Sequence, residues 1–123
     1  MTKDEIFKVL NSVLNVKGIS YNEDEGMYGK YYNTLPDALM EELYGGEEIE
    51  ADDYIVKQEE NFGGEGEGDN FWQVYSLTNT NDGNKKYIRF DGWYASHYGH
   101  EFNGDNFDIV VPKEVVKIEY YKA

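Results

Sequence analysis

The chain has 123 residues, with 25 Asp and Glu against 11 Lys and Arg, so its formal net charge is −14. A surface this negative repels phosphate, which disfavours direct binding to nucleic acid or to an anionic membrane. Aromatic residues make up 16% of the chain, which favours a folded domain over an acidic disordered tail. Cysteine is absent, so disulfides and thiolate chemistry are excluded.

The first third of the chain is predicted to be helical. A first helix is expected over residues 3–15, where Thr2 and Glu5 form a capping-box pattern and apolar residues recur at helical spacing: Ile6, Val9, Leu10, Val13 and Leu14. Residues 20–34 are expected to form an extended loop or a short strand. A second, short helix is expected over residues 36–44, starting at Pro36 and ending before Gly45-Gly46.

From residue 53 the apolar period changes to two, which is typical of strands. Strands are predicted at 54–56, 71–77, 85–90, 106–111 and 115–121. Asp82-Gly83 and Asn103-Gly104 are turn sequences, and Asp91-Gly92 predicts a bulge or tight bend. The glycine-rich stretch 63–68 holds two glutamates and lacks a following Lys-Ser/Thr, which favours a hairpin tip over a phosphate site.

These elements predict one α+β domain over residues 1–123, with a helical part at 1–45 and a β part at 53–123. The N-terminal helix and the short helix would pack on a five-stranded, mainly antiparallel, twisted sheet or partly open barrel. The N-terminus lacks the basic region and cleavage site of a secretory signal, and no apolar run approaches the ~20 residues that span a bilayer. A cytoplasmic location is therefore expected.

The negative charge is concentrated in residues 37–69, the acidic block, which holds 13 acids and one base, Lys57, for a net charge of −12. Scattered charge would serve solubility equally well, so this concentration indicates a docking surface. Four carboxylate doublets lie in it, and closely spaced carboxylates can imitate the phosphates of duplex DNA, which carries one charge per ~1.7 Å. The residues predicted to bind a partner are Glu41, Glu42, Tyr44, Glu47, Glu48, Glu50, Asp52, Asp53, Tyr54, Glu59 and Glu60.

Three further groups of residues have both a functional and a plainer structural interpretation. His97 and His100, beside Glu101, are residue types that bind zinc, but Gly99 disfavours the helix that would bring the two rings together. Ser96 and His97 are neighbours, so in a strand they would face opposite sides and could not form a nucleophile pair. The main aromatic residues fit either a core or the anchors of an interface: Trp72, Trp93, Tyr94, Tyr98, Tyr120 and Tyr121.

The second half of the chain contains a recognisable series of motifs. The stretches GEGEGDNFWQVYSL, KKYIRFDGWYASHYGHEF and FDIVVPKEVVKIEYY combine a glycine-rich lead-in, an aromatic strand, the pattern Tyr-Ile-x-x-x-Gly-x-Tyr-x-Ser-x-x-Gly-x-Glu and a Val-x-Pro-Lys-Glu-Val element. Residues 60–123 thereby resemble a family of small phage-encoded proteins. The resemblance implies a bacteriophage or prophage origin and assigns no catalytic residue. The matching residues are Gly66, Gly68, Trp72, Val74, Tyr75, Tyr87, Ile88, Gly92, Tyr94, Ser96, Gly99, Glu101, Phe102, Val110 or Val111, Pro112 and Val115.

The leading hypothesis is a non-enzymatic, anti-CRISPR-like inhibitor acting in the cytoplasm of an infected bacterium. Its acidic surface would block the basic nucleic-acid-binding groove of a CRISPR effector or another nucleic-acid enzyme. One alternative is an immunity or antitoxin-like protein that neutralises a basic nuclease. The other is a metal-dependent enzyme that uses His97 and His100. The leading hypothesis expects no cofactor, no nucleic-acid contact and no membrane contact.

Overall fold

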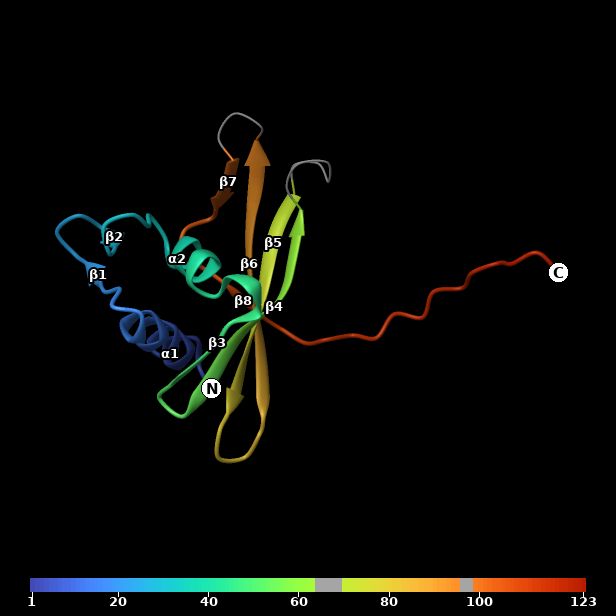
Figure 1. The fold of residues 1–123 in the computed structure, drawn as a ribbon, viewed down its shortest axis with the longest axis horizontal. Coiled ribbons are helices and arrows are strands. Elements are labelled where there is room, and N and C mark those ends of the chain that lie inside the picture. The colour runs from blue at the N-terminus through green and yellow to red at the C-terminus, as the bar shows by residue number, and fades with distance from the viewer. Residues whose placement is uncertain (64–69, 96–98) are drawn as a thin grey trace.

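The computed structural model describes residues 1–63, 70–95 and 99–123, and its helices cover one face of a strongly curved antiparallel sheet (Figure 1). The predicted α+β class, with two helices and a mainly antiparallel sheet, is confirmed. The elements are α1 (Lys3–Val16), β1 (Tyr21–Asn22), β2 (Met27–Tyr28), α2 (Leu35–Glu42), the 3₁₀ turn η1 (Tyr44–Gly46), β3 (Glu48–Ala51), β4 (Tyr54–Gly63), β5 (Asn70–Asn79), β6 (Lys85–Ala95), β7 (Gly99–Phe102) and β8 (Asp108–Val110).

The first helix follows the sequence prediction closely. The Thr2 hydroxyl oxygen accepts a hydrogen bond from the Glu5 amide at 3.1 Å, and the Glu5 carboxylate accepts one from the Thr2 amide at 3.2 Å. These two bonds satisfy amides that the first turn leaves unpaired, and they lower the pKa of the Glu5 carboxyl. The apolar stripe of α1 is buried at the five predicted positions.

The second helix starts one residue before the predicted Pro36 and ends at Glu42, with η1 completing the predicted segment. Thr34 precedes it, and the Thr34 hydroxyl accepts a hydrogen bond from the Asp37 amide at 3.2 Å. The helix also receives a long-range contact, because the Asp105 carboxylate accepts hydrogen bonds from the Leu35 amide at 2.8 Å and the Tyr28 hydroxyl at 3.2 Å. Asp105 thus joins the β1–β2 hairpin and α2 to the end of the β part.

The sheet has the order β3-β4-β5-β6-β7, and β8 pairs with β6 next to β7. The predicted turn at Asp82-Gly83 joins β5 to β6, and the predicted strands at 71–77 and 85–90 are confirmed within longer strands. Strands β3 and β7 were not predicted. Both are short edge elements, and β3 consists of only four residues, Glu48–Ala51.

The predicted interruption at Asp91-Gly92 was wrong. Strand β6 runs through Gly92, which pairs with Phe71 on one side and Phe102 on the other. The glycine serves close packing, because a Cβ atom there would lie 2.3 Å from the carbonyl oxygen of Glu101. The bulge of this sheet is instead in β4, between Gln58 and Glu60.

The predicted strand at 115–121 is not part of the sheet. After β8 the chain leaves the sheet on the side opposite the helices and runs outward as an extended segment (Figure 1). We call residues 111–123 the C-terminal arm. All of its residues are exposed.

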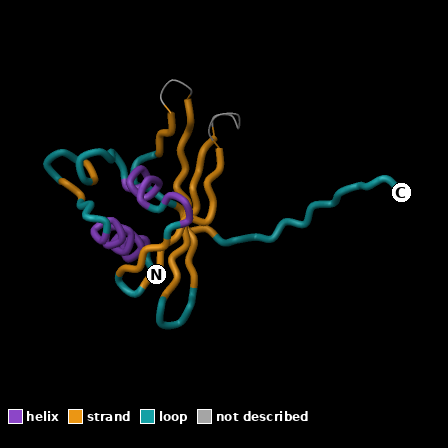
Figure 2. Tube along the Cα trace, viewed as in Figure 1, coloured by secondary structure: helices purple, strands orange, loops and turns teal. Residues whose placement is uncertain are grey.

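The core lies between the helices and one face of the sheet, and aromatic rings form its centre. Phe90 contacts the rings of Tyr75, Phe102 and Phe107, with centroids 5.6 to 6.4 Å apart. Both helices lie on this side (Figure 2). We call the opposite side of the sheet the outer face. Alternation along β5 places Phe71 and Tyr75 in the core and Trp72 and Val74 on the outer face.

Candidate functional site

The predicted binding residues fall into four places. Six of them follow one another along the end of α2, η1 and the edge strand β3, and we call this set the acidic edge: Glu41, Glu42, Tyr44, Glu47, Glu48 and Glu50. Asp52 and Asp53 form the turn between β3 and β4, and Glu59 and Glu60 lie on the outer face. Tyr54 is half-buried and packs against the core. The structure therefore gathers about half of the predicted set.

Two contacts, one from α1 and one from its C-cap residue Lys17, hold the strand of the acidic edge in place. The Ser12 hydroxyl donates a hydrogen bond to the carboxylate of Asp52, just after β3, and the Lys17 ammonium pairs with Glu47, just before β3. The hydrogen bond to Glu47 raises the pKa of Lys17. Helix α1 thus braces both ends of a strand that has only four residues.

The β3–β4 turn depends on two aspartates in a left-handed backbone conformation, with φ of 52° at Asp52 and 66° at Asp53. Positive φ at both central residues is the geometry of a two-residue hairpin turn, and Asp tolerates it better than most residues. The carbonyl oxygen of Asp53 also accepts a hydrogen bond from the Thr80 amide at 2.9 Å. These two residues therefore shape the hairpin as well as contributing charge.

The carboxylates of the acidic edge differ in how far a base neutralises them. Glu47 is paired with Lys17, and Glu48 lies 3.9 Å from Lys57. Among the described residues, no hydrogen bond or ion pair involves the carboxylates of Glu41, Glu42 or Glu50. These three side chains therefore provide the unpaired charge of the edge, although Glu42 lies near enough to Lys17 that its charge helps to raise the pKa of that lysine.

Tyr44 stands beside these carboxylates with 80% of its surface exposed. It comes after Leu43, the C-cap of α2, and begins η1, in which the next residue, Gly45, has a left-handed φ of 77°. An exposed aromatic ring among carboxylates is the kind of residue that anchors protein interfaces.

A hollow of about 500 Å³ adjoins the acidic edge between α2 and β7. Its lining combines aromatic and apolar side chains with carboxylates: Tyr31, Tyr32, Asp37, Met40, Glu41 and Phe102. Burial, and then the charges of Glu42 and Glu41, raise the pKa of the Tyr32 hydroxyl. Carboxylates beside aromatic rings suit a guanidinium group, which can pair with the first and stack on the second.

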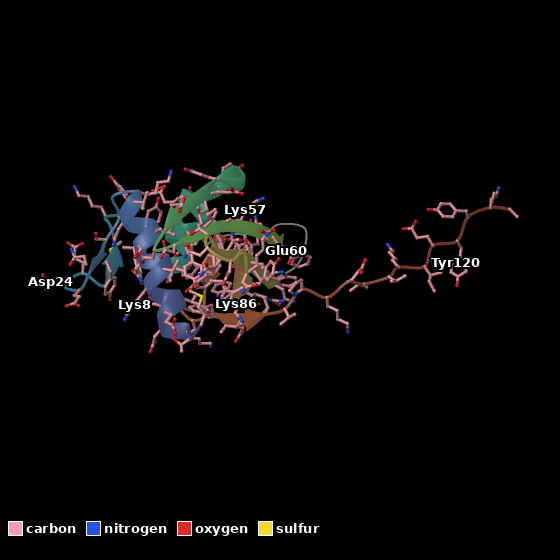
Figure 3. The ribbon with its side chains drawn as sticks, turned by 90° about the horizontal axis from the view of Figure 1, so that it is seen from below. Lys8, Asp24, Lys57, Glu60, Lys86 and Tyr120 are labelled. Carbon is pink, nitrogen blue, oxygen red and sulfur yellow. The ribbon has the colours of Figure 1, made fainter. Side chains whose placement is uncertain are left out.

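The outer face holds a second group of acids because of the bulge in β4. Neighbouring residues of a regular strand face opposite sides, but the register shift at Gln58/Glu60 lets Glu59 and Glu60 share one face. Glu59 accepts a hydrogen bond from the Ser76 hydroxyl at 2.8 Å, and Glu60 accepts one from the Trp72 indole at 3.3 Å. Figure 3 shows Glu60 on the side from which the C-terminal arm leaves, and Asp24 and Lys8 on the helix side.

Aromatic and basic side chains build the rest of this face. Phe62 stacks on Trp72 with ring centroids 3.9 Å apart, and the Arg89 guanidinium lies 4.0 Å from the centroid of Trp72. A groove of about 500 Å³, the outer groove, lies beside them. It is lined by Glu59, Glu60, Val74, Tyr87 and Arg89, together with the base of the arm at Val110–Lys113. Sequence reasoning missed the role of Phe62, which no pattern marked.

The proposed histidine chemistry falls mostly outside the described residues. Ser96 and His97 lie there, and so does the side chain of His100. Over residues 1–63, 70–95 and 99–123, no group of three or more potential ligands could hold a metal ion. Of the other aromatic candidates, Trp93 is 40% exposed and Tyr120 is 92% exposed, so both are available to a partner.

The chain was also compared with known proteins. No protein-family description, no curated protein and no solved structure gave a match. Within the described part of the chain, no helix has the length and apolar character needed to cross a membrane.

Proposed function

We propose that this protein is a non-enzymatic inhibitor that docks its acidic edge on a basic, nucleic-acid-binding groove of another protein. The observation that supports this proposal is the row of carboxylates along α2, η1 and β3, all of them exposed except the half-buried Glu42, with Tyr44 exposed among them. Glu41, Glu42 and Glu50 need no partner within the described chain, so a cationic groove can engage them without breaking an existing ion pair.

The edge is also suited to rapid association. Glu48 and Glu50 lie on the edge strand β3, and contacts from Ser12 and Lys17 hold the two ends of this strand, so these two carboxylates are held in place before binding. Charge complementarity of this kind mainly increases the association rate and is weakened by salt. The adjoining hollow offers Tyr32, Met40 and Glu41 to an arginine side chain of the partner.

The partner class follows from the chemistry and from the resemblance of residues 60–123 to small phage-encoded proteins. A phage protein that occupies a phosphate-binding groove would protect phage nucleic acid from a host enzyme. We therefore propose a CRISPR effector of the bacterial host as the target. If the protein instead inhibited a secreted or toxin nuclease with a similarly basic groove, this result would favour an immunity role.

The test compares two charge-reversal variants of equal size. The triple variant E41K/E42K/E50K reverses the unpaired carboxylates of the edge, and E23K/D24K/E25K reverses three exposed carboxylates of the β1–β2 turn. Target-DNA cleavage by a panel of purified CRISPR effectors is measured with each protein present at two salt concentrations. We expect inhibition by the wild type and the turn variant, weaker at high salt, and none by the edge variant.

Several results would contradict the proposal. Failure of the wild type to inhibit any effector in the panel would remove the CRISPR target, and inhibition of purified basic nucleases would then favour the immunity role. Equal activity of both triple variants would show that the acidic edge is not the docking surface. Circular dichroism and thermal unfolding of the variants establish that each remains folded.

A further inference from the structure

The C-terminal arm has the composition of a strand but no strand to pair with. Its large apolar side chains are exposed to between 74% and 92% of their surface: Val111, Val115, Val116, Ile118, Tyr120 and Tyr121. Val116, Ile118 and Tyr120 alternate with charged or polar residues, so an extended arm would present them on one side. Apolar exposure of this extent is typical of a segment that binds another surface.

The register of the sheet explains why the arm cannot continue in it. Val110, the last residue of β8, pairs with Tyr87, and β6 begins only two residues earlier at Lys85. Continuing that register would place Pro112 opposite Lys85, and proline has no amide hydrogen to extend the ladder. Residues 113–123 therefore pass beyond the start of β6, where the described chain offers them no neighbouring strand.

The arm is also built to stay extended. Pro112 fixes its own φ and favours an extended conformation at Val111. Residues 111–123 contain no Gly, Asn, Asp or Ser, the residues that commonly reverse the chain direction. Thirteen extended residues reach about 40 Å. A segment of this length without a turn sequence reaches another molecule more readily than it folds back on its own sheet.

The outer groove has the properties needed to receive such an arm. Val74 and Tyr87 provide apolar surface in it, Glu59 and Glu60 provide negative charge, and Arg89 and Lys113 provide positive charge. Beyond Lys113 the arm contains two lysines and two glutamates, so it too carries charges of both signs that can pair with those of the groove. The base of the arm, Val110–Lys113, lines the same groove. A twofold axis near this point would therefore bring each arm to the groove of the other copy.

We infer that two copies of this chain exchange their C-terminal arms, each arm lying in the outer groove of the other copy with Val116, Ile118 and Tyr120 against it. Such an interface is self-complementary, as twofold dimers require. It uses the outer face and the arm and leaves the acidic edge exposed, so it does not depend on the proposed function. It also gives the dimer two acidic edges.

The first experiment measures mass in solution by sedimentation equilibrium over a wide range of protein concentration. We expect the wild type to reach twice the 14.3 kDa of one chain as concentration rises. The variant V116D/I118D, altered on the inward side of the arm, should remain at the mass of one chain. The matched variant V115D/Y121D, altered on the other side, should still dimerise. A wild type that stays monomeric, or a dimer that V116D/I118D does not weaken, overturns the exchange.

The absence of cysteine allows a second, direct test of where the arm lies. A Val74→Cys chain mixed with an Ile118→Cys chain should form a disulfide between copies under mild oxidation. A Val74→Cys chain mixed with an Asp24→Cys chain should not, because Asp24 lies at the far side of the molecule (Figure 3). A disulfide formed within single chains of a V74C/I118C double variant, with none between singly substituted chains, would show that the arm folds on its own sheet and would overturn the exchange.

Discussion

The guanidinium of Arg89 lies 4.0 Å from the centroid of the Trp72 ring, on the face of the sheet that no described helix covers. The same guanidinium pairs with Asp91 at 2.7 Å, so it is held by both a ring and a carboxylate. Phe62 stacks on the same indole. These stacked and paired side chains pack together on the outer face, where no described helix covers the sheet.

We predict that Arg89→Ala lowers the free energy of unfolding by about 1 kcal/mol, because a partly exposed cation–π contact and an ion pair are lost together. The fluorescence emission of Trp72 should shift in the folded protein. Urea denaturation followed by tryptophan emission measures both effects. Lys85→Ala removes an exposed charge from the same strand and should change neither. Equal effects of the two substitutions would show that the stacking has no energetic role.

The next prediction concerns Gly92, where a Cβ atom would lie 2.3 Å from the Glu101 carbonyl oxygen. Gly92→Ala should push β7 away from β6 and lower the free energy of unfolding by about 1–3 kcal/mol. Hydrogen exchange of the β7 amides should become faster. Gly83→Ala is the control, because Gly83 has a positive φ of 75° but nothing within 4 Å of its missing Cβ. It should destabilise the hairpin turn and leave β7 protected.

The raised pKa of Tyr28 predicts that the folded protein becomes less stable at alkaline pH. Burial, and then the negative charge of Asp105, raise the pKa of its hydroxyl above the ordinary tyrosine value of about 10. Above that pH the unfolded chain releases the Tyr28 proton and the folded chain retains it. The unfolded state then binds fewer protons, so the free energy of unfolding falls as the pH rises.

The variant Tyr28→Phe lacks this proton, so its free energy of unfolding should fall less steeply above about pH 10. It should lose about 1 kcal/mol at neutral pH with the hydrogen bond to Asp105. Urea unfolding from neutral to alkaline pH gives both values. The difference between the two proteins should stay constant below about pH 9 and narrow above pH 10. A difference that is the same at every pH would contradict the prediction.

Substitution of Tyr44 tests the proposed docking surface through an aromatic residue instead of a charged one. Because its ring is exposed, Tyr44→Ala should leave the unfolding midpoint unchanged. It should weaken binding to the inhibited enzyme by at least about tenfold, as the loss of an aromatic anchor commonly does. Tyr44→Phe keeps the ring and should retain most of the affinity. Binding can be measured by titration calorimetry, and unchanged affinity of Tyr44→Ala would exclude this ring from the interface.

The regular elements could be predicted because their local patterns agree with their environment. The capping box at Thr2 and the five apolar positions of α1 are local features, and all of them are confirmed. Strand β3 could not be predicted in the same way. Its turn uses Asp52-Asp53 instead of a glycine, and its sequence EIEA reads equally well as part of a charged loop. For the C-terminal arm the error was the opposite: a strand was predicted at 115–121 where the sheet has none. Alternation of apolar and polar residues predicts a strand, but it does not show whether another strand lies beside it to pair with.

The candidate site could be predicted in composition but not in arrangement. Charge counting identified Glu41 and Glu59 alike, but only the β4 bulge explains why Glu59 and Glu60 lie together on the outer face. The pairing of Glu47 with Lys17 depends on how α1 packs along β3, a contact between residues 30 positions apart. Contacts between residues this far apart in the chain produce no periodic pattern in the sequence, so the sequence does not predict them.

In this two-layer fold, the residues that form the core and the residues exposed to other molecules lie on opposite faces of the same strands. Along β5 and β6, Phe71 and Ile88 face the core, and Val74 and Tyr87 face outward at the alternate positions. A mutation at an outward position can change recognition at little cost to folding, whereas one at an inward position risks both. A binding protein of this architecture can therefore follow a changing target by single substitutions while its scaffold remains the same.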